Sequence, residues 1–255
     1  MIPPVLRIIA VRTLQLSLLA LAGHLLWHWP LTGPRALNWA FTPALCVYFL
    51  FVFVGPWRWG LPILTHLPGA ERVVALTFDD GPSPDVTARI LDVLEEWKAP
   101  AAFFVLGDAA RKRPDLLRRM ADEGHGIGLH GDRHVPLVLL NWKAVGREIE
   151  GVRAAVQDAC PEAQMDYLRP PHGFKTLALP WLARRHGLRL CAWSVNARDY
   201  QAGTPEQIAA RVLRLARPGA IILLHDGPGC AATADALPLI LVGLRERGLA
   251  CVRLL

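Results

Sequence analysis

The chain has 255 residues, of which 53% are apolar, and its mean hydropathy is +0.28, so it has room for one ordinary domain and an additional apolar segment. Lys and Arg outnumber Asp and Glu by 28 to 22, but the cations are scattered and form no block interleaved with aromatic residues, which argues against a nucleic-acid-binding protein. The five cysteines include no CxxC pair, which argues against a disulfide framework or a thiolate metal site.

Two long runs without a formal charge lie near the N-terminus, at 13–29 and 36–57. Each is long enough to cross a hydrocarbon layer about 30 Å thick, and tryptophans that suit the membrane interface flank the second run. We therefore predict a membrane anchor over 1–60, built as a hairpin of two transmembrane helices at about 13–29 and 37–57. Membrane lipid is then a partner of the chain.

Two other interpretations of these runs stay open. Ala20-Leu-Ala22 resembles the cleavage site of a signal peptide, and the two runs could instead pack against a globular domain. The distribution of arginines bears on orientation, because Arg7 and Arg12 precede the first run whereas Arg35 is alone in the turn between the runs. This bias predicts an integral protein of a bacterial-type inner membrane with its globular domain on the cytoplasmic face.

A linker rich in proline and glycine is predicted over 61–71, followed by one domain over 72–255. The predicted strands of this domain are 72–76, 101–105, 126–129, 166–168, 188–193, 220–224 and 250–254. The predicted helices are 84–98, 114–123, 142–158, 177–186, 205–216 and 234–247. Asn141 and Thr204 are expected to cap the third and fifth of these helices. The alternation predicts an α/β fold with a parallel sheet, either a barrel or a doubly wound sheet.

Polar residues that can carry chemistry follow the predicted strands. They are Asp79 and Asp80 after the first strand, His130 and His134 after the third, Arg169 after the fourth, Asp199 after the fifth, and His225 after the sixth. The carboxyl ends of parallel strands meet at one mouth of a β/α barrel, so we expect these side chains to share one site.

His130 and His134 are four residues apart, so both imidazoles can face the same way on a helical turn or a tight loop. Two imidazoles and one carboxylate form a three-ligand site with an open position, which is typical of a catalytic metal. Asp80 is the predicted carboxylate. Most isolated histidine pairs of this spacing are surface or core features, but the neighbouring Asp79 and Asp80 favour the metal site.

The remaining side chains suit proton transfer. Asp79 is the predicted base that takes a proton from water, and His225 is the predicted acid that protonates the leaving group. Arg169 precedes a rigid Pro-Pro pair and can hold Asp79, while Asp199 can hold His225. The structural alternatives are a turn residue for Asp79, a core histidine for His225, a surface arginine for Arg169 and a loop residue for Asp199.

Five motifs occur in the order Thr77-Phe-Asp-Asp-Gly81, His130-x-x-x-His134, Arg169-Pro-Pro-x-Gly173, Trp193-Ser-Val…Arg198-Asp199 and Leu223-Leu-His-Asp226. Over about 73–255 they resemble the polysaccharide deacetylases, carbohydrate esterases built on the NodB homology domain. The resemblance implies a distorted parallel (β/α) barrel and one divalent metal ion, commonly zinc and sometimes cobalt or another ion. It implies Asp79 as base, His225 as acid, Arg169 and Asp199 as their supports, and Asp80, His130 and His134 as metal ligands.

The resemblance also implies four substrate-binding residues, His172, Tyr200, Leu223 and Trp193. The backbone N–H of His172 would stabilise an oxyanion, and Leu223 would line the slot for the acetyl methyl group. Four positions depart from the family pattern. Gly131 stands where Ser or Thr is usual, and His172 stands where Tyr is common. Asn196 and Tyr200 replace the first Asp and the Trp of the family's Asp-x-x-Asp-Trp motif, and these changes affect the substrate more than the reaction.

The sequence thus predicts a metal-dependent hydrolase that removes an N-acetyl group from an amino sugar of a polysaccharide or a lipid-linked glycan. One alternative is an O-acetyl esterase or a deformylase acting on a related carbohydrate. Another is a non-catalytic sugar-binding or scaffold protein of the membrane. The sugar-binding alternative predicts a missing ligand or base, which the motifs do not show, and the scaffold alternative predicts no bound metal.

Overall fold

A computed structural model of the protein describes residues 62–69, 71–174, 176 and 178–254. The two predicted transmembrane helices, at about 13–29 and 37–57, lie outside the described residues. None of the helices in the described part of the chain has both the length and the apolar character that are needed to span a bilayer.

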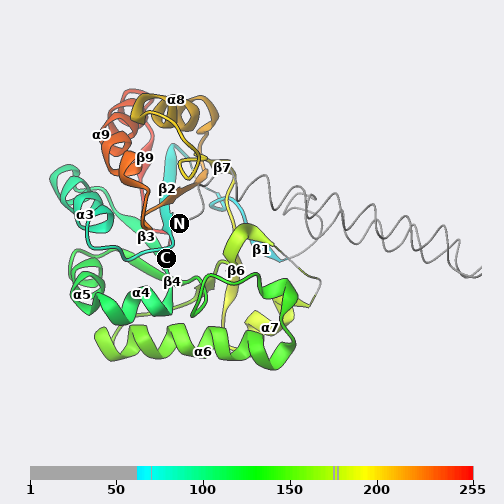
Figure 1. Ribbon diagram of the computed structural model, residues 1–255. Helices are drawn as coiled ribbons and strands as arrows, with labels where there is room; N and C mark the ends of the chain where they lie inside the picture. The colour runs from blue at the N-terminus through cyan, green and yellow to red at the C-terminus, as the bar shows by residue number, and fades with distance from the viewer. Residues whose placement is uncertain (1–61, 70, 175, 177, 255) are drawn as a thin grey trace, which may run out of the picture. The chain divides into compact units, whose positions relative to one another are not determined.

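A parallel sheet lies at the centre of the helices in Figure 1. In chain order its strands are β1 (Ile63–Leu64), β2 (Val73–Asp79), β3 (Ala101–Val105), β4 (Gly126–Leu129), β5 (Tyr167–Leu168), β6 (Arg189–Cys191), β7 (Val195–Asn196), β8 (Ile221–His225) and β9 (Ala250–Cys251). In space they follow the order β1-β6-β5-β4-β3-β2-β8-β7, and β9 pairs with the start of β2. The path ends at β1 on one side and β7 on the other, so the described part of the chain forms a distorted half-barrel.

The helices form an arc around these strands in Figure 1. They are α3 (Val86–Trp97), α4 (Gly107–Lys112), α5 (Pro114–Asp122), α6 (Trp142–Ala159), α7 (Leu179–Arg185), α8 (Pro205–Leu215) and α9 (Ala231–Glu246), with short 3-10 turns η1 (Leu137–Leu139) and η2 (Pro171–Gly173). The pairings between these strands are all parallel, which leaves the carboxyl ends of the strands together at one end of the sheet.

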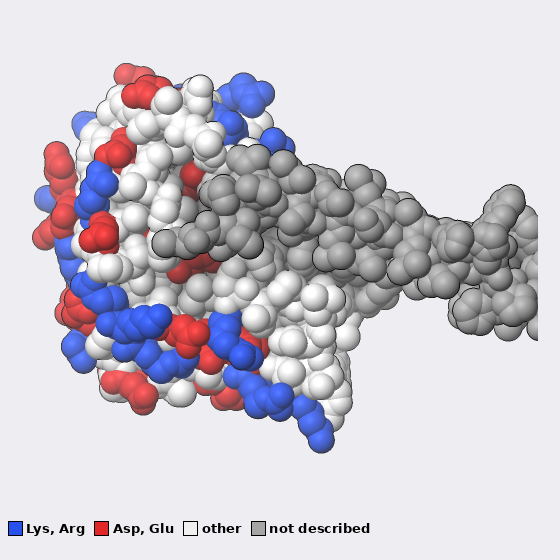
Figure 2. Space-filling model, viewed as in Figure 1, with Lys and Arg blue, Asp and Glu red and all other residues white. Residues whose placement is uncertain are grey.

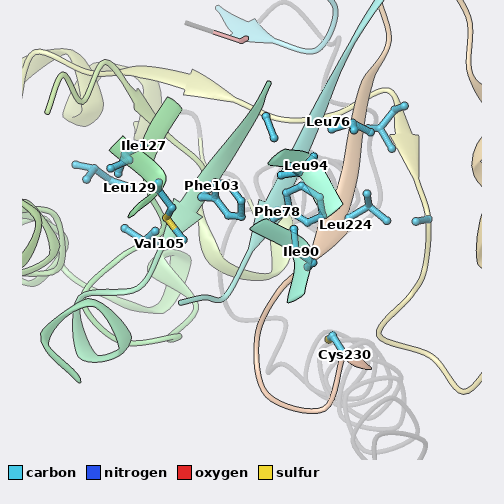
Figure 3. Packing of buried hydrophobic residues seen from close by; sticks show 14 of the residues in the cluster. Leu76, Phe78, Ile90, Leu94, Phe103, Val105, Ile127, Leu129, Leu224 and Cys230 are labelled. Atoms are coloured by element: carbon cyan, nitrogen blue, oxygen red, sulfur yellow. The ribbon is translucent and has the colours of Figure 1, made fainter. Parts of the chain in front are cut away.

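The alternation of side chains along β2 separates the core from the site. Leu76 and Phe78 point toward the helices, where Phe78 stacks on Phe103 with 5.1 Å between ring centroids (Figure 3). Burying one such apolar side chain contributes about 1.5–3 kcal/mol to stability. Thr77 and Asp79 therefore point to the opposite face, toward the interior of the half-barrel.

The pairing of β2 with β8 places two predicted catalytic residues side by side. Asp79 and His225 are register partners in this parallel ladder, and each is the last residue of its strand. Adjacent strands lie about 4.8 Å apart, so the two side chains begin from neighbouring points at the same end of the sheet.

The parallel β/α organisation and both helix caps are confirmed. The side chain of Asn141 accepts a hydrogen bond from the backbone N–H of Ala144 at 2.9 Å, at the start of α6. Thr204 and Gln207 form a reciprocal capping box at the start of α8. Capping side chains satisfy N–H groups that lack a partner within the helix, which is why local sequence is enough to locate them.

Two parts of the sequence prediction need correction. The stretch 61–71, predicted as a linker, contains β1, which pairs with β6 through Ile63 and Leu64 and so belongs to the sheet. β2 ends at Asp79, three residues beyond the predicted end, because the polar Thr77 and Asp79 continue its ladders to both neighbours. α4 and β7 were not predicted, since segments so short carry no readable periodicity.

Basic and acidic side chains are intermixed on the face seen in Figure 2. Arg119 illustrates this pattern, with its guanidinium 2.8 Å from Asp92 and 3.3 Å from Glu95. Exposed ion pairs of this kind contribute about 0–1 kcal/mol each, so the fold depends mainly on the packed core beneath them.

Candidate active site

The turn after β2 directs two neighbouring carboxylates into different environments. Asp79 is 3% exposed and forms a buried ion pair inside the half-barrel. Asp80 has a left-handed backbone with φ of 78°, so its side chain leaves the alternation of the strand and faces two imidazoles. The two carboxylates can therefore take different chemical roles.

Asp80, His130 and His134 bring three metal-type donor atoms together. Asp80 Oδ1 lies 3.3 Å from His130 Nε2 and 3.2 Å from His134 Nε2, and one donor atom from each residue lies within 4.8 Å of the others. His130 directly follows β4, and His134 lies in the loop beyond it. The first turn of α4 holds this loop, because the Gly107 N–H donates to the carbonyl of Gly131 at 3.1 Å.

Two observations show that these donors fit a divalent cation. Asp80 Oδ1 is buried and, within the described residues, lacks a hydrogen-bond partner, as suits an oxygen that would bind a cation. His130 Nδ1 lies 2.7 Å from the carbonyl oxygen of Arg169, and when it donates there its Nε2 keeps a free lone pair on the side of Asp80. One carboxylate and two imidazoles suit zinc or a chemically similar ion.

The charge states of Asp80 and His134 also suit ligation. Burial lowers the pKa of His134 to about 4 against the opposing charge of Asp80, so its imidazole is neutral at physiological pH. Burial alone would raise the pKa of Asp80, but the adjacent imidazole of His130 holds that pKa well below its usual value. A neutral imidazole and an ionised carboxylate are the forms that bind metals.

Arg169 is wholly buried behind Asp79. Its Nη1 donates to Asp79 Oδ1 at 2.6 Å and to Thr77 Oγ1 at 2.9 Å, and its Nη2 donates to the carbonyl of Ala192 at 3.0 Å. The guanidinium also lies 3.9 Å from the ring centroid of Phe104. A buried charge is tolerated when it is paired and hydrogen-bonded, so Arg169 and Asp79 each depend on the other.

His225 is held by Asp199. Asp199 Oδ1 lies 2.8 Å from His225 Nδ1, and Asp199 Oδ2 accepts from the backbone N–H of His225 and from Thr233 Oγ1, both at 2.7 Å. Burial alone would lower the pKa of His225, but the hydrogen bond and charge of Asp199, aided by Asp79 and Asp80, raise it to about 9. The imidazole is therefore protonated at neutral pH, with Nε2 on the side away from Asp199.

Leu223 and Tyr200, two of the predicted substrate-binding residues, lie next to His225. Leu223 precedes His225 by two residues in β8 and so faces the same side of the sheet. The ring of Tyr200 packs edge-on against the imidazole of His225, with 5.2 Å between centroids, and Tyr200 is 39% exposed.

His172 and Trp193 lie near the other half of the site. The ring of His172 is 4.2 Å from that of His134, and its backbone φ is 60°. The ring centroid of Trp193 is 5.8 Å from the guanidinium of Arg169. Ten of the eleven predicted site residues therefore contact another member of the set, and the strand β8 places Leu223 on the same face as His225, while their roles stay predictions.

Two buried carboxylates outside the predicted set hold the loops of the site. Glu148 of α6 accepts from the backbone N–H of Arg133 at 2.8 Å and from its guanidinium at 2.6 Å. Asp226 accepts from the backbone N–H of Gly81 at 3.0 Å. The position of Asp226 beside His225 could have indicated it, whereas nothing in the helical pattern of α6 distinguishes Glu148.

The sequence of this chain is similar to those of known deacetylases. The family model described as Polysaccharide deacetylase matches residues 66–191. A chitooligosaccharide deacetylase of Rhizobium leguminosarum bv. trifolii is 42% identical over 157 residues, which cover 62% of this chain and 73% of the relative. A peptidoglycan-N-acetylglucosamine deacetylase of Bacillus cereus is 35% identical over 184 residues, which cover 71% of this chain and 66% of the relative.

A solved structure agrees with these matches. The crystal structure of the Bc1960 peptidoglycan N-acetylglucosamine deacetylase, in complex with an N-hydroxybenzamide compound, superposes with a TM-score of 0.73 at 32% sequence identity. The superposition covers 78% of this chain and 94% of that chain. The similarity in structure therefore extends over nearly the whole of the other protein.

Proposed function

The chain belongs to the polysaccharide deacetylase family, and on this premise we propose that it hydrolyses the N-acetyl group of N-acetylglucosamine units in a chitooligosaccharide or a peptidoglycan strand. The enzyme is a metal-dependent carbohydrate de-N-acetylase. One observation supports the assignment of its residues above all others: the carboxylate of Asp79 and the imidazole of His225 start from paired positions of adjacent strands, beside the cluster of metal-type donors.

Asp80, His130 and His134 would hold the metal. When bound, the metal supplies a Lewis acid that polarises the amide carbonyl and makes water more acidic. Zinc is the ion we expect, with cobalt or another divalent ion as the alternative. The carboxylate of Asp80 and the neutral imidazole of His134 are already in the forms that such binding requires.

Asp79 is the proposed general base. Arg169 holds Asp79 Oδ1 at 2.6 Å, whereas Asp79 Oδ2 lies 3.8 Å from His130 Nε2, on the side of the metal-type donors. Oδ2 is therefore the oxygen that can accept a proton as water attacks the acetyl carbon. Arg169 acts through Asp79 by fixing its orientation, which makes it a positioning residue.

His225 is the proposed general acid. Asp199 engages Nδ1, so the proton for the leaving amine comes from Nε2 as the carbon–nitrogen bond breaks and acetate forms. The further roles of His172 as an oxyanion donor, of Leu223 as a wall of the methyl slot, and of Tyr200 and Trp193 as sugar contacts belong to the same proposal.

The Asp199→Asn variant tests the acid through its pH dependence. A histidine with a raised pKa keeps its proton below that pKa, so the acid function of His225 is present below about pH 9 and is lost as pH rises through that value. Removing the charge of Asp199 lowers the pKa of His225, so the alkaline limb of the kcat/KM profile should move to lower pH. Thr233→Val, which removes only a neutral donor to Asp199, should move it less. An unchanged alkaline limb in Asp199→Asn contradicts the assignment of the acid.

Acetate release from a defined substrate tests the function itself. The full-length chain, loaded with zinc or cobalt, should release acetate from an N-acetylated chitooligosaccharide and leave a primary amine. A chelator should abolish this activity, and added metal should restore it. A matched O-acetylated sugar tests the esterase alternative. Metal-loaded protein that acts only on the ester contradicts the proposed amide hydrolysis.

For the N-terminal 60 residues we propose a hairpin of two transmembrane helices that holds the catalytic domain at the cytoplasmic face of a bacterial-type inner membrane. The two charge-free runs and the excess of arginine before the first run support this proposal. A membrane-proximal or lipid-linked glycan would suit such an anchor. A reporter active only in the cytoplasm, fused to the C-terminus, should be active, and activity of an exported reporter there would reverse the orientation.

A further inference from the structure

Asp226 is a buried carboxylate to which the proposed reaction gives no role. It directly follows the proposed acid His225 and is 1% exposed. Both of its side-chain oxygens reach the segment after β2: Oδ1 accepts from the Gly81 N–H at 3.0 Å, and Oδ2 accepts from Thr87 Oγ1 at 2.6 Å. A full set of partners on one segment indicates a specific role for this carboxylate.

The main chain of Asp226 engages the same segment. Its N–H donates to the carbonyl of Asp79 at 2.9 Å, and its carbonyl accepts from Ser83 Oγ at 2.8 Å. The peptide groups on either side of Asp80 are thus both hydrogen-bonded to Asp226. A single residue, Asp226, therefore forms hydrogen bonds to both sides of the turn that carries the proposed metal ligand Asp80.

The packing around this turn leaves no room for a side chain at Gly81 or Gly227. A Cβ atom at Gly81 would lie 2.0 Å from Asp226 Oδ2, and a Cβ atom at Gly227 would lie 2.7 Å from the Cβ of Asp80. Only glycine can therefore occupy either position without a shift of the neighbouring groups. The Asp226–Gly227 segment fits closely against the turn at Asp80.

Asp80 needs such a support. Its φ of 78° lies in the left-handed region, which is strained for an L-residue and persists only where the surrounding structure holds it. In that conformation Asp80 Oδ1 faces His130 and His134. We propose that Asp226 is a positioning residue that holds the 79–81 turn, so that the carboxylate of Asp80 is presented to the metal. The inference rests on the proposed metal-dependent function.

Metal affinity of full-length variants tests this role. The dissociation constant for Co²⁺ can be measured by competition with a chromogenic chelator for the wild type, Asp226→Ala and Asp226→Asn. Asparagine keeps an acceptor for the Gly81 N–H and can donate to Thr87 Oγ1, so this variant should stay within about threefold of the wild type. Alanine keeps neither contact, and its affinity should fall by about 10-fold or more.

A matched control separates positioning from general destabilisation. His125 is 6% exposed and accepts from the backbone N–H of Ala101 at the opposite end of the strands. His125→Ala should lose stability, measured as the thermal midpoint of the metal-free protein, without losing affinity for Co²⁺. If His125→Ala weakens metal binding as much as Asp226→Ala does, the proposed role of Asp226 is wrong.

Two further results would also overturn the proposal. The first is an affinity of Asp226→Ala for Co²⁺ equal to that of the wild type. The second is an equal loss of affinity in Asp226→Asn and Asp226→Ala, which would show that the charge of Asp226 matters and its hydrogen-bond geometry does not. If metal-free Asp226→Ala does not fold, Thr87→Val replaces it. Its binding should be weaker than that of the wild type by more than about threefold, and binding within that range contradicts the role. Deacetylation by the wild type is measured separately. If the wild-type protein binds Co²⁺ but does not deacetylate the substrate, the proposed function is wrong, whereas the comparison of metal affinity among the Asp226 variants stays valid.

Discussion

We expect the Asp79→Asn variant to bind its metal and to lose almost all turnover, with kcat lower by about three orders of magnitude. The amide has nearly the shape of the carboxylate, and its oxygen can still accept from Arg169, so the site should keep its geometry. A neutral amide cannot take a proton from water at Oδ2, which is the function that the variant removes. The measurement is kcat on an N-acetylated chitooligosaccharide together with elemental analysis of the same sample.

Asp80→Asn is the matched control for this variant. It makes the same chemical change at the adjacent residue, but there it weakens a proposed metal ligand, so metal content and turnover should fall together. A rate in Asp79→Asn close to that of the wild type at equal metal content would contradict the assignment of the base. Loss of metal in both variants would place Asp79 among the ligands.

We expect Arg169→Met to lower the free energy of unfolding by about 3–5 kcal/mol and to reduce turnover by about 100-fold. Methionine has a similar length but no charge, so Asp79 would remain as a buried carboxylate without its cation. The carboxylate of Asp79 would also lose the hydrogen-bond donor that fixes its Oδ1, so the orientation of its Oδ2 would no longer be fixed. Urea unfolding and steady-state kinetics measure the two effects.

Arg119→Met provides the comparison for the effect on stability. Arg119 contacts three carboxylates at the surface, yet its removal should cost about 1 kcal/mol or less because solvent screens these pairs. Equal losses in the two variants would show that burial of the Arg169–Asp79 pair is not the cause. In the double variant Asp79→Asn with Arg169→Met, part of the stability lost in Arg169→Met should return, since no unpaired carboxylate remains.

Much of the fold could be predicted from local sequence. The predicted strands 101–105 and 126–129 coincide with β3 and β4, because apolar runs of this length bounded by turn residues have few other structures open to them. β1 escaped prediction since two residues in a stretch with prolines carry no pattern, and its pairing with β6 depends on a partner about 125 residues away. The ends of the sheet at β1 and β7 could not be predicted either, because they depend on which distant strands pair.

The site likewise has a part that local sequence could predict and a part that depends on long-range pairing. Asp79, Asp80, His130, His134 and His225 could be selected because each lies at or beyond the carboxyl end of a strand and has a side chain suited to metal binding or proton transfer. The contacts of Arg169 with Asp79 and of Asp199 with His225 were predicted as well. The contacts that hold the turn at Asp80 could not be predicted. Asp226 meets Gly81 across 145 positions of sequence, and that contact exists only after β2 and β8 have paired. A carboxylate buried by such pairing looks like any other acidic residue until the fold is known.

The register between β2 and β8 has a consequence for how this family can diversify. Because Asp79 and His225 are opposite each other in a ladder of main-chain hydrogen bonds, the gap between proton acceptor and proton donor is fixed by the spacing of strands. If His172 and Tyr200 contact the sugar as proposed, changes in the loops that carry them would alter which sugars are accepted, while the distance between the proposed proton acceptor and proton donor would stay the same.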